Sequence, residues 1–381
     1  MQTIPAAEVV RLKHALPFWL SLGTVPLALL AASKGGWAVA LLPVYTWGLF
    51  SVLDVLTGRN EDNADPDTPE AGLVWYRLIT LVWFPVQFVL VFGMIWYATR
   101  AGHLGLAGKA GLFFGMGVIS GTIGINYSHE LMHQKSRVER WLADLLLAMV
   151  LYGHFRSEHL RVHHLYVGTP RDAVTARYNE GFHRFYPRVL VECLRSAWRA
   201  EAAMLARRDL PAWHWRNPFW RYWALQAGMI LLALAVGGGQ GLALFLLQAT
   251  VAVWQLELVN YIEHYGLTRR HLGGGRYEHV LPRHSWNATQ RASNWLLINL
   301  QRHSDHHTKP DRRFPLLQSH MEDAPQLPWG YPVMTALAMV PPLWRRAMNR
   351  RVRDWRRQHY PDISDWTAYN KAGNPMPAGA P

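Results

Sequence analysis

Long apolar runs, separated by arginine-rich polar stretches, constrain this chain more than any other feature of its sequence. Half of its 381 residues are apolar, and a helix needs about 20 consecutive apolar residues to cross the hydrocarbon core of a bilayer. The pattern predicts an all-α integral membrane protein with six transmembrane helices. The expected spans cover residues 16–32, 37–56, 73–97, 110–127, 222–236 and 242–262.

No second domain is expected, so residues 1–381 form one membrane-embedded domain. Residues 57–72 are acidic and contain proline, which predicts a solvated linker, and a loose tail is expected from about residue 372. The apolar stretch Trp141–Phe155 is too short for a full crossing. We interpret it as a re-entrant or interfacial helix. The run over 16–32 has an alternative interpretation as a cleaved signal peptide, because small residues follow it.

The distribution of positive charge predicts the orientation. With a cytoplasmic N-terminus, 35 of the 39 Lys and Arg residues lie on the cytoplasmic side, including those of the polar segments 128–221 and 263–381. Both termini are then cytoplasmic. The net charge of +13 suits an acidic partner or anionic lipid, and the absence of a nucleic-acid-binding motif argues against nucleic acid. Cys193 is the only cysteine, which excludes an iron–sulfur centre within this chain.

Three histidine clusters lie in these polar segments. Imidazoles are rarely gathered for packing, because each ring brings two polar nitrogens. Histidines four residues apart share a helix face and can chelate one ion, whereas adjacent histidines diverge by about 100°. The clusters contain both spacings, which suits two neighbouring metal ions. The candidate ligands are His129, His133, His159, His163, His164, His264, His303, His306 and His307.

Acidic and amide side chains near the histidines are candidates for supporting roles. Metal-bound imidazoles commonly donate their other N–H to a carboxylate, although ordinary surface ion pairs are an equal alternative here. Glu257 lies inside the sixth expected span and shares a helix face with Asn260 and His264, so either a functional role or a structural hydrogen bond is open. The candidates are Glu130, Glu158, Glu257, Asn260, Glu263 and Asp305.

One histidine motif has a competing interpretation. His129-Glu130-Leu131-Met132-His133 fits the H-E-x-x-H pattern of zinc proteases, in which the glutamate is the general base. A membrane protease would need only one further ligand. It would leave most of the clustered histidines unexplained.

Four motifs together resemble the bacterial membrane-bound alkane 1-monooxygenase (alkane hydroxylase) family. The first histidine box is His129–His133, the second is Glu158–His164 and the third is Leu300–His307. Asn260–Leu267 matches a further signature that the broader desaturase and hydroxylase superfamily lacks. Two residues depart from the family pattern without removing a ligand: Gln134 replaces the usual Lys, and Val162 replaces the usual Gly.

The resemblance implies a six-helix enzyme of the bacterial inner membrane with a non-haem di-iron site held by the histidines. It implies that O₂ is the co-substrate, that rubredoxin and its reductase supply electrons, and that an alkane from the bilayer becomes a primary alcohol. Three alternatives remain open: methyl hydroxylation of an aromatic such as xylene, desaturation or hydroxylation of a fatty acid, and metal binding without catalysis. Trp47 and Phe50 of the second span could close a substrate tunnel, but we expect ordinary packing for both.

Overall fold

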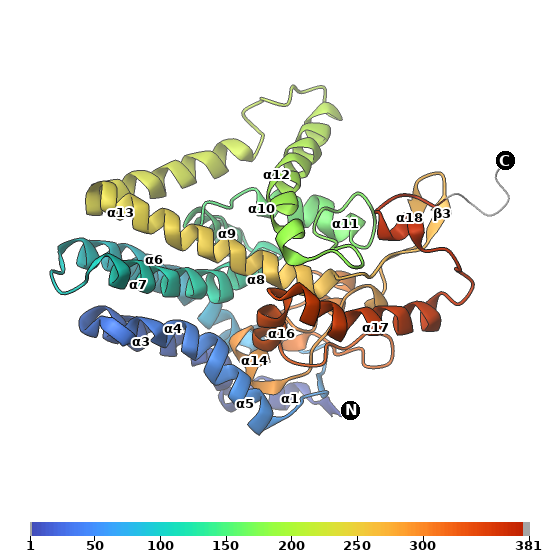
Figure 1. The fold of residues 1–381 in the computed structure, drawn as a ribbon, viewed down its shortest axis with the longest axis horizontal. Coiled ribbons are helices and arrows are strands. Elements are labelled where there is room, and N and C mark those ends of the chain that lie inside the picture. The colour runs from blue at the N-terminus through green and yellow to red at the C-terminus, as the bar shows by residue number, and fades with distance from the viewer. Residues whose placement is uncertain (1, 376–381) are drawn as a thin grey trace.

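The chain forms a bundle of long helices, with shorter helices and loops gathered at one end of the bundle (Figure 1). The computed structural model describes residues 2–375. Within that range, five helices are long and apolar enough to cross a membrane, judged by length and composition. They are Leu12–Lys34, Gly36–Thr57, Glu70–Arg100, Leu106–Met132 and Phe219–His264.

Most of these long helices are assembled from shorter pieces. The N-terminal part contains α1 (Ala6–Val9), α2 (Leu12–Ala15), η1 (Leu16–Gly23), α3 (Thr24–Lys34), η2 (Gly36–Ala40), α4 (Leu41–Pro43), η3 (Val44–Leu49) and α5 (Phe50–Thr57). The next part contains η4 (Glu70–Leu73), α6 (Val74–Arg100), α7 (Leu106–Ile119), η5 (Ser120–Ile125) and α8 (Asn126–Met132). Both η3 and η5 are π-helical turns. Such wide turns occur frequently near functional sites.

The helix α13 (Phe219–His264) is a hairpin and contains two of the predicted spans. Its 46 residues reverse direction at Gly238, which has φ 60° and ψ −155°, and Figure 1 shows the two arms diverging from this turn. The arms touch near the turn, where a Cβ on Gly241 would lie 2.8 Å from the carbonyl oxygen of Ala233. The predicted spans 222–236 and 242–262 are these arms. The structure therefore has five candidate spans, and six crossings stay a prediction.

Glycines of the fourth span permit close helix contact. A Cβ on Gly117 would lie 2.7 Å from the carbonyl oxygen of Gln248, and one on Gly121 would lie 2.8 Å from that of Ala252. The second arm of α13 therefore packs directly against the backbone of α7 and η5. This contact aligns the two helices whose ends carry His129 and His264.

The predicted helix over 141–155 differs from the observed one. Here α9 spans Arg137–Ala148, and the side chain of Ser136 caps it by accepting a hydrogen bond from the Glu139 amide. The chain then turns through Leu151, which has φ 55°, and enters α10 (Phe155–Glu158), η6 (His159–His163) and α11 (His164–Tyr166). A long helix that we had not predicted, α12 (Phe182–Ala206), fills much of the polar segment 128–221.

The C-terminal part folds around the histidine-bearing end of the bundle. It contains β3 (His271–Gly273), β4 (Arg276–Tyr277), η7 (Pro282–His284), α14 (Arg291–Leu296), α15 (His303–Thr308), η8 (Phe314–Leu316), α16 (Tyr331–Ala338), α17 (Pro341–His359) and α18 (Thr367–Asn370). Of the predicted loose tail, residues 376–381 lie outside the described range. Pro375 accepts a hydrogen bond of 3.0 Å from the ring of His271.

The prediction of a solvated linker over 57–72 is confirmed only in part, because residues 66–67 and 69–71 are exposed but other residues of the segment are buried. Its strand β2 (Asn63–Ala64) is buried and pairs in parallel with β1 (Thr3–Ile4). The guanidinium of Arg302 donates to the side-chain oxygen of Asn63 at 3.0 Å and to the carbonyl oxygen of Asp62 at 2.7 Å. The linker therefore holds the residue that precedes α15, and with it the third histidine box.

We predict that Gly238→Ala destabilises the protein, because the backbone conformation of Gly238 is accessible almost only to glycine. The expected loss is about 1–3 kcal/mol, seen as a lower midpoint of thermal unfolding in detergent. Gly239→Ala is the matched control, since a Cβ at that position meets no atom within 4 Å and its φ is ordinary. Equal midpoints for the two variants would contradict the assignment of the turn.

Candidate metal centre

All nine predicted histidines converge, and they form two adjoining groups. In each group, the ligand atoms of four histidines lie within 4.8 Å of one another. The first group contains His129, His133, His159 and His306. The second group contains His163, His264, His303 and His307. His164 belongs with the first group, because its Nε2 lies 2.9 Å from Nε2 of His159 and 3.1 Å from that of His306.

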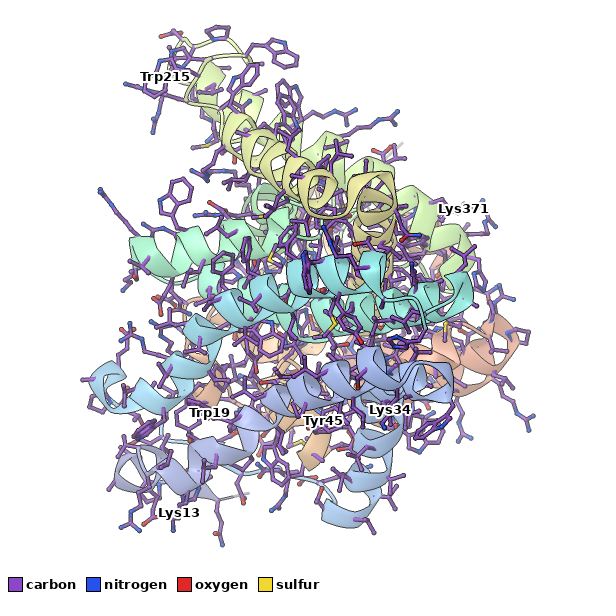
Figure 2. The ribbon with its side chains drawn as sticks, turned by 90° about the vertical axis from the view of Figure 1, so that its left-hand side faces the viewer. Lys13, Trp19, Lys34, Tyr45, Trp215 and Lys371 are labelled. Carbon is purple, nitrogen blue, oxygen red and sulfur yellow. The ribbon has the colours of Figure 1, made fainter. Side chains whose placement is uncertain are left out.

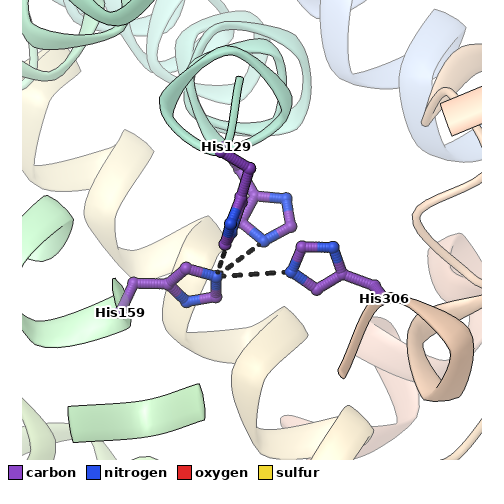
Figure 3. A group of neighbouring side chains, drawn as sticks. His129, His159 and His306 are labelled. Atoms are coloured by element: carbon purple, nitrogen blue, oxygen red, sulfur yellow. Dashed lines mark hydrogen bonds between the residues drawn. The ribbon is translucent and has the colours of Figure 1, made fainter. Parts of the chain in front are cut away.

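The histidines come from the ends of separate helices. In Figure 3, His129, His159 and His306 point toward one another from three different segments. The adjacent residues His306 and His307 fall into different groups, as their divergence on a helix predicts. His264 is the last residue of α13, and it brings the end of a long apolar helix to the second group.

A π-helical turn changes the pairing that we expected in the second box. The spacing of His159 and His163 predicted one shared ion, but the structure places them in different groups. Because η6 is π-helical, residues five apart are aligned. His159 therefore faces His164, and their Nε2 atoms are 2.9 Å apart.

The geometry of the first group fits a metal ion better than a hydrogen-bond network. Nε2 of His159 lies 2.9 Å from His129, 3.1 Å from His133, 2.9 Å from His164 and 3.4 Å from His306. A neutral imidazole nitrogen cannot hydrogen bond to four others at once. Nitrogens that bind one ion at about 2.1 Å lie roughly 3.0–3.4 Å apart, which is the spacing of these contacts.

The second group also presents nitrogens toward a common point. Nε2 of His303 lies 3.1 Å from Nε2 of His264 and 3.0 Å from that of His307. Nε2 of His163 is buried and has no hydrogen-bond partner within residues 2–375. Buried polar atoms are nearly always satisfied in native proteins. A metal ion between these rings would satisfy the nitrogen of His163.

Burial favours the neutral form of several of the rings in the two groups. It lowers the pKa of His303 and of His307 well below the ordinary value, and the positive charge that neighbouring histidines would carry lowers it further. The same holds for four rings of the first group. The pKa is lowered by burial and then by neighbouring histidines for His133, His159, His164 and His306. A neutral imidazole keeps the lone pair that a metal ligand needs.

Asp172 supports the second group, and our sequence analysis missed it. Its Oδ2 lies 3.1 Å from Nδ1 of His163 and accepts a hydrogen bond of 2.7 Å from the Thr175 hydroxyl. Burial raises the pKa of the Asp172 carboxyl, but His163 and Thr175 lower it more, so the net shift is downward. Carboxylates commonly fix metal-bound imidazoles in this way. Asp172 is the only acidic residue between His164 and Thr175, and this was the available signal.

One of the predicted acidic residues contacts the second group directly. Glu263 lies with Oε2 3.4 Å from Nε2 of His303. Glu257 instead accepts hydrogen bonds from the Tyr152 hydroxyl at 2.9 Å and the Asn260 amide at 3.0 Å. Glu158 is fully buried, and burial together with the nearby negative charges raises its pKa well above the ordinary value. Glu257 is one of the charges that raise the pKa of Glu158, so the two buried carboxylates are neighbours.

The other two predicted carboxylates pair elsewhere. Glu130 accepts a hydrogen bond of 3.1 Å from Gln134 and lies 3.9 Å from Arg313. Gln134, which stands where the family usually has Lys, therefore contacts a residue of the first histidine box. Asp305 binds Arg312 at 2.6 Å and His320 at 2.7 Å. With Glu130 engaged in this way and further histidines beside His129 and His133, the protease interpretation gains no support.

A narrow cavity, with about 50 Å³ of free space, leads from the apolar helices to the histidines. His129, His159 and His303 lie at its polar end, together with Asn260 and Glu263. Its walls are mostly apolar, and the wall residues include Trp47, Ile125, Leu256, Val259, Leu296 and Leu300.

The two aromatic residues predicted to pack ordinarily behave differently. Trp47 packs against the rings of Phe114 and Trp254, as predicted, and it also lines the cavity. Phe50 is fully buried against the ring of Tyr45 and is not among the lining residues, as predicted.

Comparison with known proteins agrees with this geometry. The fatty acid desaturase family model matches residues 102–338, which is more than half of the chain, so the chain belongs to that family. Two alkane 1-monooxygenases of Pseudomonas aeruginosa are each 38% identical to it; one alignment covers 89% of this chain and 88% of the relative, the other 92% and 93%. The chain therefore belongs to the alkane 1-monooxygenase family. The hydroxylase component of xylene/toluene monooxygenase from Pseudomonas putida is 27% identical over 81% of this chain and 82% of its own length.

We predict that Asp172→Asn weakens metal binding about 10–100-fold, because His163 loses the charged partner that orients its ring. The measurement is the metal retained after dialysis against a graded series of chelator concentrations. Glu130→Gln is the control, since Glu130 contacts Gln134 and Arg313 rather than a histidine. Equal retention in the two variants would remove Asp172 from the metal centre.

Proposed function

We propose that this protein hydroxylates the terminal carbon of alkanes to give primary alcohols at a di-iron site. The observation that carries the proposal is the pair of adjoining histidine groups at the end of a cavity with apolar walls. The relatives named as alkane 1-monooxygenases align with most of this chain. The proposed substrate is apolar, would dissolve in the bilayer, and would enter the cavity from the side of the long helices.

The proposed reaction consumes two electrons, which an external donor must supply. One oxygen atom of O₂ enters the C–H bond, and the other leaves as water with two electrons and two protons. Two non-haem irons held by the histidine groups would supply the activation of O₂. The apolar walls would orient the alkane and exclude water, which protects the site from side reactions.

The number of ligands supports two irons rather than one metal ion. Nine imidazoles exceed the needs of a single tetrahedral zinc site. Imidazole ligands are suitable for iron, and reactive iron sites keep open positions for O₂. A division into five and four histidines would leave both ions such positions. We assign His129, His133, His159, His164 and His306 to one iron and His163, His264, His303 and His307 to the other.

Sequence similarity to known enzymes favours alkanes over the alternative substrates. The xylene/toluene relative is 27% identical, against 38% for the two alkane 1-monooxygenases of Pseudomonas aeruginosa. A fatty-acid desaturase would share the class and the histidine boxes, so site geometry alone does not separate these functions. Trp47, which lines the cavity, would have to move for a long chain to enter, because the free space is small.

The electron donor is proposed to be rubredoxin, kept reduced by rubredoxin reductase. Cys193 is buried and is the only cysteine, so an iron–sulfur carrier must be a separate protein. A second cavity, of about 730 Å³, lies between α12 and the loop that follows the second histidine box. Asp172, the partner of His163, lines this cavity. A carrier docked there would be separated from the second group by one side chain.

The charge of this cavity suits an acidic carrier. Two of its arginines pair with carboxylates, Arg161 with Glu201 and Arg188 with Glu180. Four others form no salt bridge with any described residue, and they give the rim its positive charge. They are Arg171, Arg177, Arg199 and Arg207. Complementary charge of this kind accelerates the association of protein partners.

The same proposal includes a location. We propose that residues 128–221 and 263–381 lie in the cytoplasm, with both termini on that side, and that the long helices lie in the bacterial inner membrane. The five apolar helices support insertion into a membrane. The orientation rests on the positive-inside rule.

We predict that the purified protein, supplied with reduced rubredoxin and O₂, converts octane to 1-octanol and holds two irons per chain. Product analysis by gas chromatography and metal analysis by mass spectrometry make the two measurements. His264→Ala should abolish octanol formation, because it removes one of the four nitrogens of the second group. Xylene as substrate tests the nearest alternative. A single zinc per chain, or oxidation of xylene without any octanol, would contradict the proposal.

We predict that reversing two unpaired charges, Arg171→Glu with Arg199→Glu, raises the KM for rubredoxin about tenfold at low salt, because the docking cavity loses its positive rim. The rate at saturating rubredoxin should change little. Arg346→Glu with Arg350→Glu, on the exposed face of α17, is the control with the same change of net charge. An equal rise in KM for the control pair would indicate attraction by net charge alone.

A further inference from the structure

An exposed tryptophan cluster lies where α12 ends and α13 begins. We call this cluster the tryptophan corner; it contains Trp198, Trp213, Trp215, Trp220 and Trp223. The ring centroids of Trp198 and Trp213 are 4.6 Å apart, and those of Trp220 and Trp223 are 5.4 Å apart. Trp213 also lies 6.0 Å from both Trp220 and Trp223, so the loop over 207–218 is packed against α12 and α13 through Trp213. The ring of Trp215 lies beside that of His214, at 5.5 Å.

The tryptophan corner exposes large apolar side chains on the protein surface. Trp213 is 63% exposed and Trp215 is 72% exposed. Contiguous exposed apolar patches of this kind mark contacts with proteins or membranes. Tryptophan in particular is enriched where a protein meets the interface between a bilayer and water.

The position of the corner favours a membrane over a protein partner. In Figure 1, α12 runs across the direction of the long helices, so it lies parallel to a membrane that they would cross. In Figure 2, Trp215 lies near the top of the view, at one extreme of the molecule. The first arm of α13 begins at Phe219, directly after the loop, and belongs to a candidate span. The corner is therefore continuous with a helix that would enter the bilayer.

Positive charge accompanies the exposed rings. Arg208 and Arg216 form no salt bridge with any residue in the range 2–375, and the guanidinium of Arg216 lies 5.2 Å from the ring of Trp215. Asp209 is the only acidic residue between positions 207 and 218. Arginines near a membrane surface attract anionic headgroups, and one planar guanidinium group can donate two parallel hydrogen bonds to one phosphate.

We propose that the tryptophan corner is a membrane-surface anchor that binds the headgroups of anionic phospholipids. The rings of Trp213 and Trp215 lie in the interfacial layer, and Arg208 and Arg216 bind the lipid phosphates. This role is separate from the oxidation proposed above and does not depend on it.

The anchor is connected to the candidate metal centre through α12. The carboxylate of Glu201 accepts hydrogen bonds of 2.7 Å from the Ser157 hydroxyl and 2.6 Å from Arg161. The hydroxyl of Tyr222, on the first arm of α13, lies 2.9 Å from that of Ser157. Ser157 precedes His159 by two residues. Lipid bound at the corner therefore stabilises the packing of α12 and α13 against the second histidine box.

The test is the thermal unfolding of the full-length, metal-loaded protein in nanodiscs of phosphatidylcholine with and without phosphatidylglycerol. We expect phosphatidylglycerol to raise the unfolding midpoint by several degrees, because a ligand that binds the folded state stabilises it. Arg208→Gln with Arg216→Gln should remove most of this rise while leaving the aromatic cluster intact. Arg346→Gln with Arg350→Gln, which removes the same charge from α17, should keep the full rise.

Three results would overturn the proposal. The first is an equal midpoint in both lipids for the unaltered protein. The second is an equal loss of the rise in both arginine pairs, which would indicate a response to net charge. The third is a rise that inorganic phosphate reproduces in phosphatidylcholine alone, or that appears only when a nanodisc holds two copies. Because unfolding is measured rather than turnover, failure of the anchor and failure of the proposed oxidation are distinguishable.

Discussion

The convergence of nine imidazoles, seven buried and two half-buried, is the constraint on which the rest of this structure depends. Each ring brings two nitrogens into the site, and an unsatisfied buried polar atom costs about 1–3 kcal/mol. Carboxylates and hydroxyls satisfy some of these atoms, as Asp172 does for His163. The Nε2 atoms converge instead on one another at 2.9–3.4 Å. Such an arrangement is stable when a cation binds between the rings, so the site explains why the fold tolerates them.

Holding these rings requires that segments far apart in the sequence are fixed precisely. The long helices meet through glycine contacts between α7 and α13, and this brings His129 and His264 to the same end of the bundle. Arg302 fixes the third histidine box by donating hydrogen bonds to the side chain of Asn63 and the backbone of Asp62, both in the 57–72 loop. Arg313, nearby, pairs with the buried Glu139 at 2.8 Å. The polar loops are therefore structural supports for the centre rather than passive connections.

The sequence predicted the apolar helices, the nine histidines and the family, because these depend on local composition and spacing. It did not predict features that depend on tertiary contact. The π-helical turn at η6 separates His159 from His163, and no spacing rule for ordinary helices gives that result. Asp172 was missed because a loop brings it back to His163. The linker over 57–72 was misjudged in part, because its acidic composition hid the buried strand β2. Trp47 was expected to pack ordinarily, and only the helix arrangement shows that it faces the cavity.

The two cavities approach the histidines from different directions. The apolar cavity ends at His129 and His159 of the first group and at His303 of the second. The arginine-lined cavity shares no lining residue with the apolar one and includes Asp172, whose carboxylate contacts His163. In the proposed function, an apolar substrate and a charged protein partner would use separate entrances, because a charged surface offers an alkane no favourable contact. Electrons would enter from the arginine-lined cavity, and the apolar cavity would stay dry.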